Sequence, residues 1–308
     1  MVKTGRLAWL VWVIGVFAYA AAIMQRTSLG VLGQQTSDHF GTSVSIISTF
    51  VMVQLATYAI AQTPVGVLVD RYGSRTVMIC GSAVLVTAQT IMAFADVLPL
   101  AFGARILLGL GDACLYGSVL RLLPTWFSPS RVPVLSQLTG LLGQMGQVAS
   151  AVFLLPLFNA RGWLWTFLGA ALVCVVAAGA TALWVRDAPP GQTRPRPKEE
   201  RLADLPRGIA AAWRHPATRL GFWVHFTSGF SVNVFAMIWG VKWLGQAQGL
   251  NEIDSAFLFN LTALGSIAFG PLLGWLTARH PLRRSNLALM VIGANMLAWL
   301  AVLLWPGR

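Results

Sequence analysis

Nine long apolar stretches constrain what this chain can fold into more than any other feature. A helix needs about 20 mostly apolar residues to cross the hydrocarbon of a bilayer. Runs that meet this requirement lie at about 7–33, 43–65, 76–95, 97–122, 134–157, 162–185, 219–244, 255–277 and 285–305. The strands of a membrane barrel are about ten residues of alternating polarity, whereas these runs are long and continuous. The expected fold class is therefore an all-α, polytopic membrane protein.

Charge composition agrees with this class and excludes others. Charged residues make up 10% of the chain, against roughly 25% in soluble domains. The net charge of +12 invites a nucleic-acid interpretation, but no segment between the apolar runs is long enough to build a basic groove for phosphates. Cys80, Cys114 and Cys174 all fall inside apolar runs, where cysteine behaves as a small hydrophobe. We expect no nucleic-acid partner, no metal and no cofactor.

The distribution of Lys and Arg predicts the orientation. If the N-terminus is cytoplasmic, 17 of the 22 basic residues fall on the cytoplasmic side and four on the other, with Arg105 inside a span. This asymmetry follows the positive-inside rule. The first apolar run continues past Ala18-Tyr19-Ala20, which resembles a signal cleavage site, so we expect an uncleaved first span. The predicted location is the inner or plasma membrane.

A basic segment divides the nine spans into six and three. Residues 187–218 have the composition of a cytoplasmic linker, and the Pro-rich stretch 189–197 should be extended. The second half favours a short surface helix, with Asp204 as its N-cap and Leu205, Ile209 and Trp213 on one face. The predicted domains are a six-helix bundle at 1–186, the linker, and a three-span unit at 219–308. A Gly-x-Leu turn followed by basic residues occurs at both Gly66 and Gly274, as internal repeats of secondary transporters would produce.

Three motifs in order give a family resemblance. The loop Gly66-Val-Leu-Val-Asp70-Arg71-Tyr-Gly73-Ser-Arg75 resembles the G-x-L-x-D-R-x-G-R-R signature of the major facilitator superfamily. The stretch from Arg105 through Gly109 to Gly111 resembles that family's R-x-x-x-G-x-G pattern, and residues 126–131 (WFSPSR) resemble its W-F-P-P-x-x-R. The family's members typically have twelve spans in two six-helix bundles. The resemblance therefore implies a complete first bundle and a second bundle that lacks three spans.

The signature loop joins the second and third predicted spans. Gly73 allows a positive φ or close packing, and Arg71 and Arg75 hold the turn in the cytoplasm. The resemblance implies that Asp70 locks an outward-facing state, and Arg121 or Arg131 is its expected partner in this chain. The alternative is that the loop is only a topological turn.

Three charged residues inside predicted spans call for an explanation, since each costs at least roughly 2.5–3.5 kcal/mol. Arg26 begins an R-x-x-L stretch that resembles the one in organic anion:proton symporters, which implies that it binds a substrate carboxylate or phosphate. Those members often have an acid where Gln25 stands and a Glu where Asp112 stands, so proton coupling is assigned to Asp112. Arg105 is seven residues from Asp112, too far for easy pairing, and is a second candidate for substrate binding. The alternatives are an interfacial anchor for Arg26, a structural anchor for Arg105 and a protonated, inactive Asp112.

Polar side chains on the spans predict a central cavity. Tyr19 shares a face with Arg26, Gln54 and Tyr58 repeat at a four-residue interval, and Gln144 lies on the fifth span. Asn233 on the seventh span is the candidate from the second bundle. Glycines 140, 143 and 146 give the fifth span a small-residue face for close packing. The interval between Arg105 and Asp112 also contains Gly109 and Gly111, which let backbone or substrate approach.

The predicted function is secondary active transport of a small, anionic organic solute by alternating access, coupled to protons. A drug or metabolite exporter is the alternative within transport, disfavoured because the fifth span lacks the Gly-Pro signature of antiporters. A truncated pseudo-transporter without transport activity is the alternative outside it. A membrane-embedded enzyme is disfavoured because no catalytic cluster or metal-ligand spacing is present in the loops.

Overall fold

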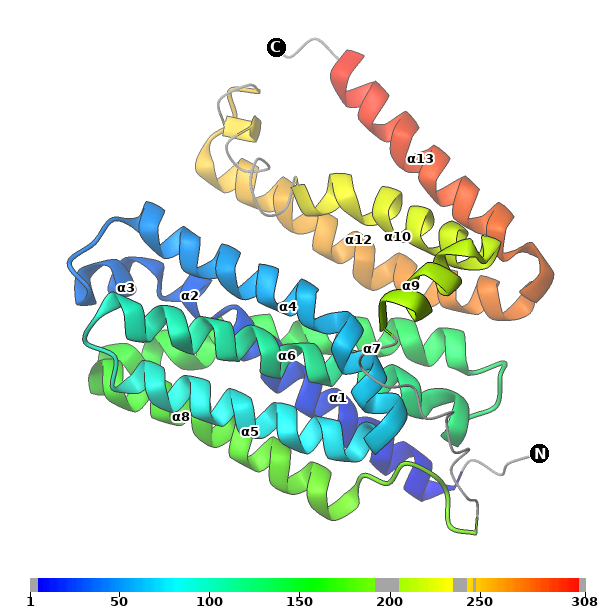
Figure 1. Cartoon of the computed structure of the whole chain (residues 1–308). Coiled ribbons are helices and arrows are strands. Elements are labelled where there is room, and N and C mark those ends of the chain that lie inside the picture. The colour runs from blue at the N-terminus through cyan, green and yellow to red at the C-terminus, as the bar shows by residue number, and fades with distance from the viewer. Residues whose placement is uncertain (1–4, 192–204, 235–242, 246–247, 305–308) are drawn as a thin grey trace. The chain divides into compact units, whose positions relative to one another are not determined.

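The computed structural model describes residues 5–191, 205–234, 243–245 and 248–304. These residues form helices and connecting turns, with no strand among them (Figure 1). The chain divides into two compact units, Met1–Leu202 and Ala203–Arg308, and the division falls inside the predicted linker. Each unit is described separately.

The first unit contains the predicted six-span region. Its helices are α1 (Arg6–Arg26), α2 (Ser28–Val31), α3 (Gly33–His39), α4 (Val44–Tyr72), α5 (Ser74–Ala93), α6 (Leu98–Trp126), α7 (Val132–Ala149), the π-helical turn η1 (Ser150–Leu154) and α8 (Leu155–Trp184).

Glycine conformations set two of the breaks between these helices. Gly73 has a φ of 96° and separates α4 from α5. This conformation is unfavourable for residues that have a Cβ atom. Gly162 has a φ of 75° and a non-helical backbone inside α8. The break therefore lies at the first residue of the predicted span 162–185, although α7, η1 and α8 follow one another directly.

The first predicted span, 7–33, is too long. The helix α1 ends at Arg26, and the rest of the apolar run forms the short helices α2 and α3. The local reason is hydrogen bonding: the hydroxyl of Thr27 donates to the carbonyl of Ile23 at 2.9 Å, and that of Ser28 donates to the carbonyl of Gln25 at 2.8 Å. Such side-chain bonds compete with helical backbone bonds.

Helices α1 and α6 lie at the centre of the first unit. Helix α1 packs against α6, α7 and α8, while α6 also packs against α4 and α5 (Figure 1). The buried core consists mainly of aliphatic and small side chains from these helices. The charged residues discussed below therefore lie on the two most enclosed helices of the unit.

The second unit contains α9 (Leu205–Arg214), α10 (Pro216–Val234), α12 (Glu252–Arg279), the 3-10 turn η4 (Pro281–Arg283) and α13 (Arg284–Leu304). Helix α10 contacts α9 and α13. The surface helix expected in the linker corresponds to α9, whereas its expected N-cap, Asp204, is outside the described residues. The predicted span 219–244 also runs partly outside them, at 235–242.

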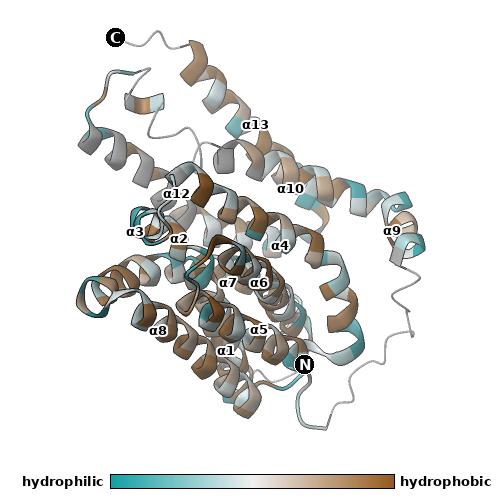
Figure 2. Ribbon diagram, turned by 60° about the vertical axis from the view of Figure 1, so that its left-hand side comes forward, coloured by the Kyte–Doolittle hydropathy of each residue, from teal (hydrophilic) through white to brown (hydrophobic). Residues whose placement is uncertain are grey.

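Within the described residues, six helical stretches are long and apolar enough to cross a membrane. One of them, Val132–Trp184, has 53 residues, enough for two crossings, and contains the break at Gly162. Figure 2 shows hydrophobic residues along much of the length of the helices of the first unit. The expected fold class is confirmed: the chain is an all-α, multi-pass membrane protein.

Candidate functional site

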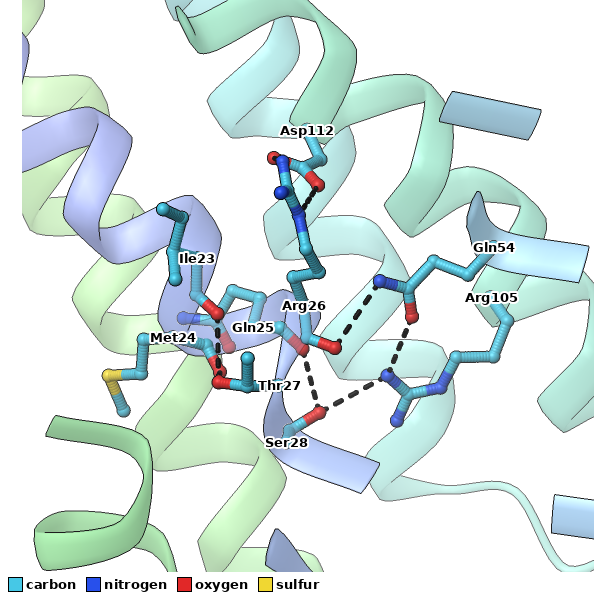
Figure 3. A network of polar contacts seen from close by, with 9 residues as sticks. All are labelled: Ile23, Met24, Gln25, Arg26, Thr27, Ser28, Gln54, Arg105 and Asp112. Carbon is cyan, nitrogen blue, oxygen red and sulfur yellow. Dashed lines mark hydrogen bonds and ion pairs between the residues drawn. The ribbon is translucent and has the colours of Figure 1, made fainter. Parts of the chain in front are cut away.

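A two-point ion pair joins α1 to α6. Arg26, the last residue of α1, donates from Nε to Oδ2 of Asp112 at 2.6 Å and from Nη2 to Oδ1 at 3.0 Å (Figure 3). Asp112 is the middle residue of α6 and only 1% of its side chain is exposed, whereas 23% of the Arg26 side chain is exposed. Paired donors of a guanidinium match the geometry of a carboxylate. The proposed anion-binding and proton-carrying residues are thus bound to each other.

The aromatic ring of Tyr58 lies against Arg26 of this pair. The guanidinium of Arg26 lies 4.6 Å from the ring centroid of Tyr58 on α4, within the range of a cation–π interaction. Tyr19, seven residues before Arg26 on α1, is buried, and its ring centroid lies 4.8 Å from that of Tyr116 on α6. The structure therefore brings Tyr58 to Arg26, and Tyr19 to a neighbouring aromatic contact.

Arg105 lies in a different environment on the same helix as Asp112. Its side chain is fully buried, and its Nη1 donates to the Ser28 hydroxyl at 3.1 Å and to Oε1 of Gln54 at 3.4 Å. Gln54 in turn donates from Nε2 to the backbone carbonyl of Arg26 at 3.3 Å. Nε and Nη2 of Arg105 have no hydrogen-bond partner in the described part of the chain.

The three charges of this region do not cancel. Arg26 and Asp112 neutralise each other, and among the described residues no carboxylate pairs with Arg105. Buried charges are normally paired or hydrogen-bonded because desolvation is costly. The region therefore carries a formal excess of one positive charge, which favours the approach of an anion.

Glycines bring the helices that carry these residues close together. A Cβ on Gly109 would collide with the carbonyl of Gln54 on α4, and one on Gly111 would lie 2.7 Å from the carbonyl of Gly81 on α5. On α7, a Cβ on Gly146 would collide with the carbonyl of Ala20 on α1, and one on Gly143 with the ring of Tyr19. The glycines of α6 therefore allow the backbones of α4 and α5 to approach closely, and the small-residue face of α7 packs against α1.

Gln144 and Asn233 are the remaining predicted site residues. Gln144 is exposed on α7, since the glycines on either side of it turn toward α1. Asn233 belongs to α10 in the second unit, and its side chain is outside the described residues. The structure does not bring Gln144 to the ion pair.

The signature loop carries its own ion pair. Asp70 near the end of α4 pairs with Arg121 near the end of α6, one of its two expected partners. The backbone N–H of Arg75 donates to Oδ1 of Asp187 at 3.0 Å, and its Nη2 donates to the carbonyl of Ala182 at 2.6 Å. Arg75 thus ties the start of α5 to the end of α8.

The other loop residues have simpler surroundings. Arg71 lies 5.3 Å from the ring centroid of Tyr72. Gly66 has open space where a Cβ would stand. The positive φ expected as one of two options for Gly73 is present.

A buried chain of hydrogen bonds between side-chain amides next to the ion pair was not predicted from the sequence. Gln89 on α5 donates to Oε1 of Gln25 at 2.7 Å, and Gln25 donates to the carbonyl of Ala170 on α8 at 3.1 Å. Both glutamines are fully buried. The available signal was the presence of Gln25 and Gln89 inside apolar runs, where a polar side chain needs a partner.

Comparisons with known proteins agree with the fold and the motifs. The sequence profile described as "Major Facilitator Superfamily" matches residues 15–307. The chain is 26% identical over 267 residues to an uncharacterized MFS-type transporter of Mycobacterium tuberculosis, covering 85% of this chain and 58% of that protein. It is 23% identical over 283 residues to a protein of Cupriavidus necator named "probable sulfoacetate transporter", covering 88% and 65%.

Two further similarities extend this set. An oxalate:formate antiporter of Oxalobacter formigenes is 24% identical over 233 residues, covering 75% of this chain and 54% of that protein. The chain thus spans about three fifths of the length of the curated relatives it matches. The crystal structure of the human organic anion transporter MFSD10 is similar in fold, with a TM-score of 0.60 at 15% identity, covering 89% of this chain and 72% of that one. The family profile, the relatives and the fold agree: this chain belongs to the Major Facilitator Superfamily.

Proposed function

We propose that the chain carries a small organic anion across a membrane by secondary active transport, with a proton as coupling ion. The ion pair between Arg26 and Asp112 is the observation on which this proposal rests. Two relatives support the substrate class, since their names specify sulfoacetate, oxalate and formate, which are small organic anions. The excess positive charge contributed by Arg105 supports it independently.

The geometry suggests how anion and proton act on one switch. A carboxylate that enters beside Tyr58 competes with Asp112 for the Nε and Nη2 donors of Arg26. Protonation of Asp112 removes its negative charge and releases Arg26 to the anion, so proton and anion favour the same state. When both leave, the ion pair re-forms and closes the empty site. Ligands shift such an equilibrium only through their different affinity for its two states.

The remaining parts of the proposal concern orientation and organisation. The N-terminus is cytoplasmic and the membrane is the inner or plasma membrane, as the distribution of basic residues predicts. Residues 187–218 link a first bundle at 1–186 to the unit at 219–308. The pair between Asp70 and Arg121 acts as a latch between transport states.

Uptake into proteoliposomes tests the anion site. With radiolabelled oxalate and sulfoacetate as probes, Arg26→Ala should abolish uptake while leaving insertion into the membrane unchanged. Arg161→Ala is the matched control, because it removes an exposed arginine of α8 beside the break at Gly162. Unchanged uptake by Arg26→Ala, alongside active wild-type protein, would remove Arg26 from the binding site.

Anion exchange without a proton is a second candidate function, favoured by the relative named as an oxalate:formate antiporter. An exchanger would take up labelled oxalate only when liposomes are preloaded with an anion, and a proton gradient would not change the rate. A proton symporter would accumulate the label in empty liposomes when the outside is acidified.

A further inference from the structure

The carbonyl end of α1 is held by side chains from outside the helix. The last four carbonyls of any helix have no intrahelical partner, and within hydrocarbon no water replaces it. Here the carbonyl of Ile23 accepts from both the backbone N–H and the hydroxyl of Thr27, and the carbonyl of Met24 accepts from the same hydroxyl. The hydroxyl of Ser28 donates to the carbonyl of Gln25. The carbonyl of Arg26 accepts from the amide of Gln54 on α4 instead.

Arg105 supports two of these capping groups at once. Its Nη1 donates to the Ser28 hydroxyl and to Oε1 of Gln54. Ser28 and Gln54 are nearly completely buried, so few alternatives to these bonds exist. The positive charge of Arg105 also faces the negative end of the α1 dipole, an arrangement that is favourable for a cation.

The side chain and the backbone of Arg26 point to different partners. Figure 3 shows the side chain extending toward Asp112, while its carbonyl faces Gln54, with Arg105 on the far side of that amide. We infer that Arg105 is a positioning residue: acting through Gln54 and Ser28, it fixes the end of α1 so that the guanidinium of Arg26 meets Asp112. It sets the strength of the ion pair without touching the transported anion.

This inference rests on the proposed function of Arg26, but its test does not depend on transport. The interaction between positions 26 and 112 is measured by a double-mutant cycle, from Arg26→Ala, Asp112→Asn and the double variant, in reversible unfolding of purified protein in mixed micelles. The cycle isolates the pair from the overall stability of the protein. It is then repeated in the Gln54→Leu background.

The expected result is a loss of coupling in that background. The coupling between the two positions should fall to less than half of its wild-type value, since the end of α1 is no longer fixed. Gln62→Leu is the matched control: Gln62 lies two turns further along α4, and its Nε2 has no partner in the described part of the chain. This variant should leave the coupling unchanged.

Variants of Arg105 connect the effect to the cation. Arg105→Gln should reduce the coupling in the same direction as Gln54→Leu, and the two losses should add only in part, because Arg105 acts through Gln54 as well as through Ser28. Arg105→Lys should retain part of it, because the ammonium keeps the charge. If Arg105→Gln does not fold, Ser28→Ala replaces it, with the same expected direction.

Two results would overturn the inference. Unchanged coupling in both the Gln54→Leu and the Ser28→Ala background would show that the end of α1 is fixed by other contacts. If Arg105→Lys reduced the affinity for oxalate but left the coupling between positions 26 and 112 unchanged, Arg105 would instead bind the anion directly, through its unpartnered Nε and Nη2. A failure of Arg26→Ala to affect uptake would instead overturn the proposed function and leave the coupling result standing.

Discussion

The two partners of the central ion pair should differ in how much their loss destabilises the protein. Arg26→Ala leaves a carboxylate that is 1% exposed, on the middle residue of α6. Removing one partner of a buried pair typically costs about 3–5 kcal/mol, because the remaining charge is buried without compensation. We expect this variant to lose stability in that range.

The reverse substitution should be milder. Asp112→Asn leaves Arg26, which is 23% exposed and keeps its contact with the ring of Tyr58. Partial hydration and a cation–π contact worth about 0.5–2 kcal/mol offset part of the lost pairing. The expected loss is about 1–2.5 kcal/mol, roughly half of the value for the buried pair.

The double variant should recover part of the stability that Arg26→Ala loses. Arg26→Ala combined with Asp112→Asn buries no unpaired charge, so it should be more stable than Arg26→Ala alone by about 1–2 kcal/mol. Unfolding midpoints of all four proteins in one detergent, followed by tryptophan fluorescence, provide the comparison. Equal losses for the two single variants, or a larger loss for Asp112→Asn, would refute the reasoning from burial.

Three further predictions concern the scaffold around the site. Gly146→Ala should destabilise the protein by about 1–3 kcal/mol, because its Cβ would meet the backbone of α1, whereas Gly140→Ala, with 4.0 Å to its nearest neighbour, should be nearly neutral in the same unfolding assay. Gly73→Ala should cost about 1–3 kcal/mol, since a φ of 96° with a ψ of 155° is a conformation that essentially only glycine adopts; a midpoint equal to that of wild type would contradict this. Asp70→Asn should change stability by less than about 1 kcal/mol, because its pair with Arg121 is largely exposed. The same variant should alter the rate of oxalate uptake. A large loss of stability with an unchanged uptake rate would show that the loop is a purely structural turn.

The helices were predictable because hydropathy is a local property. Continuous apolar runs specify spans whatever their neighbours are. The turn at Gly73 was predictable because this glycine lies between Arg71 and Arg75, where one apolar run ends and the next begins. The end of α1 was less accessible to this reasoning. The run continues to residue 33, while the helix ends at Arg26 because Thr27 and Ser28 bond to its carbonyls.

The site was harder to predict because it depends on the orientation of each helix about its own axis, which decides the neighbour that a side chain faces. Arg26 and Asp112 are 86 positions apart, and hydropathy gives their depth but not the direction in which they point. The regular interval of Gln54 and Tyr58 suggested a lining for a cavity, whereas Gln54 bonds to the backbone of Arg26. Gln144 shows the same limit: packing of Gly143 and Gly146 against α1 turns it outward.

Proton movement driven by an anion tests the central claim most directly. Proteoliposomes loaded with a pH-sensitive dye and held at zero membrane potential receive an inward gradient of oxalate or sulfoacetate. Wild-type protein should acidify the interior as the anion enters, and Asp112→Asn should take up the anion without acidification. Equal acidification by both proteins would contradict a proton switch at the Arg26–Asp112 pair.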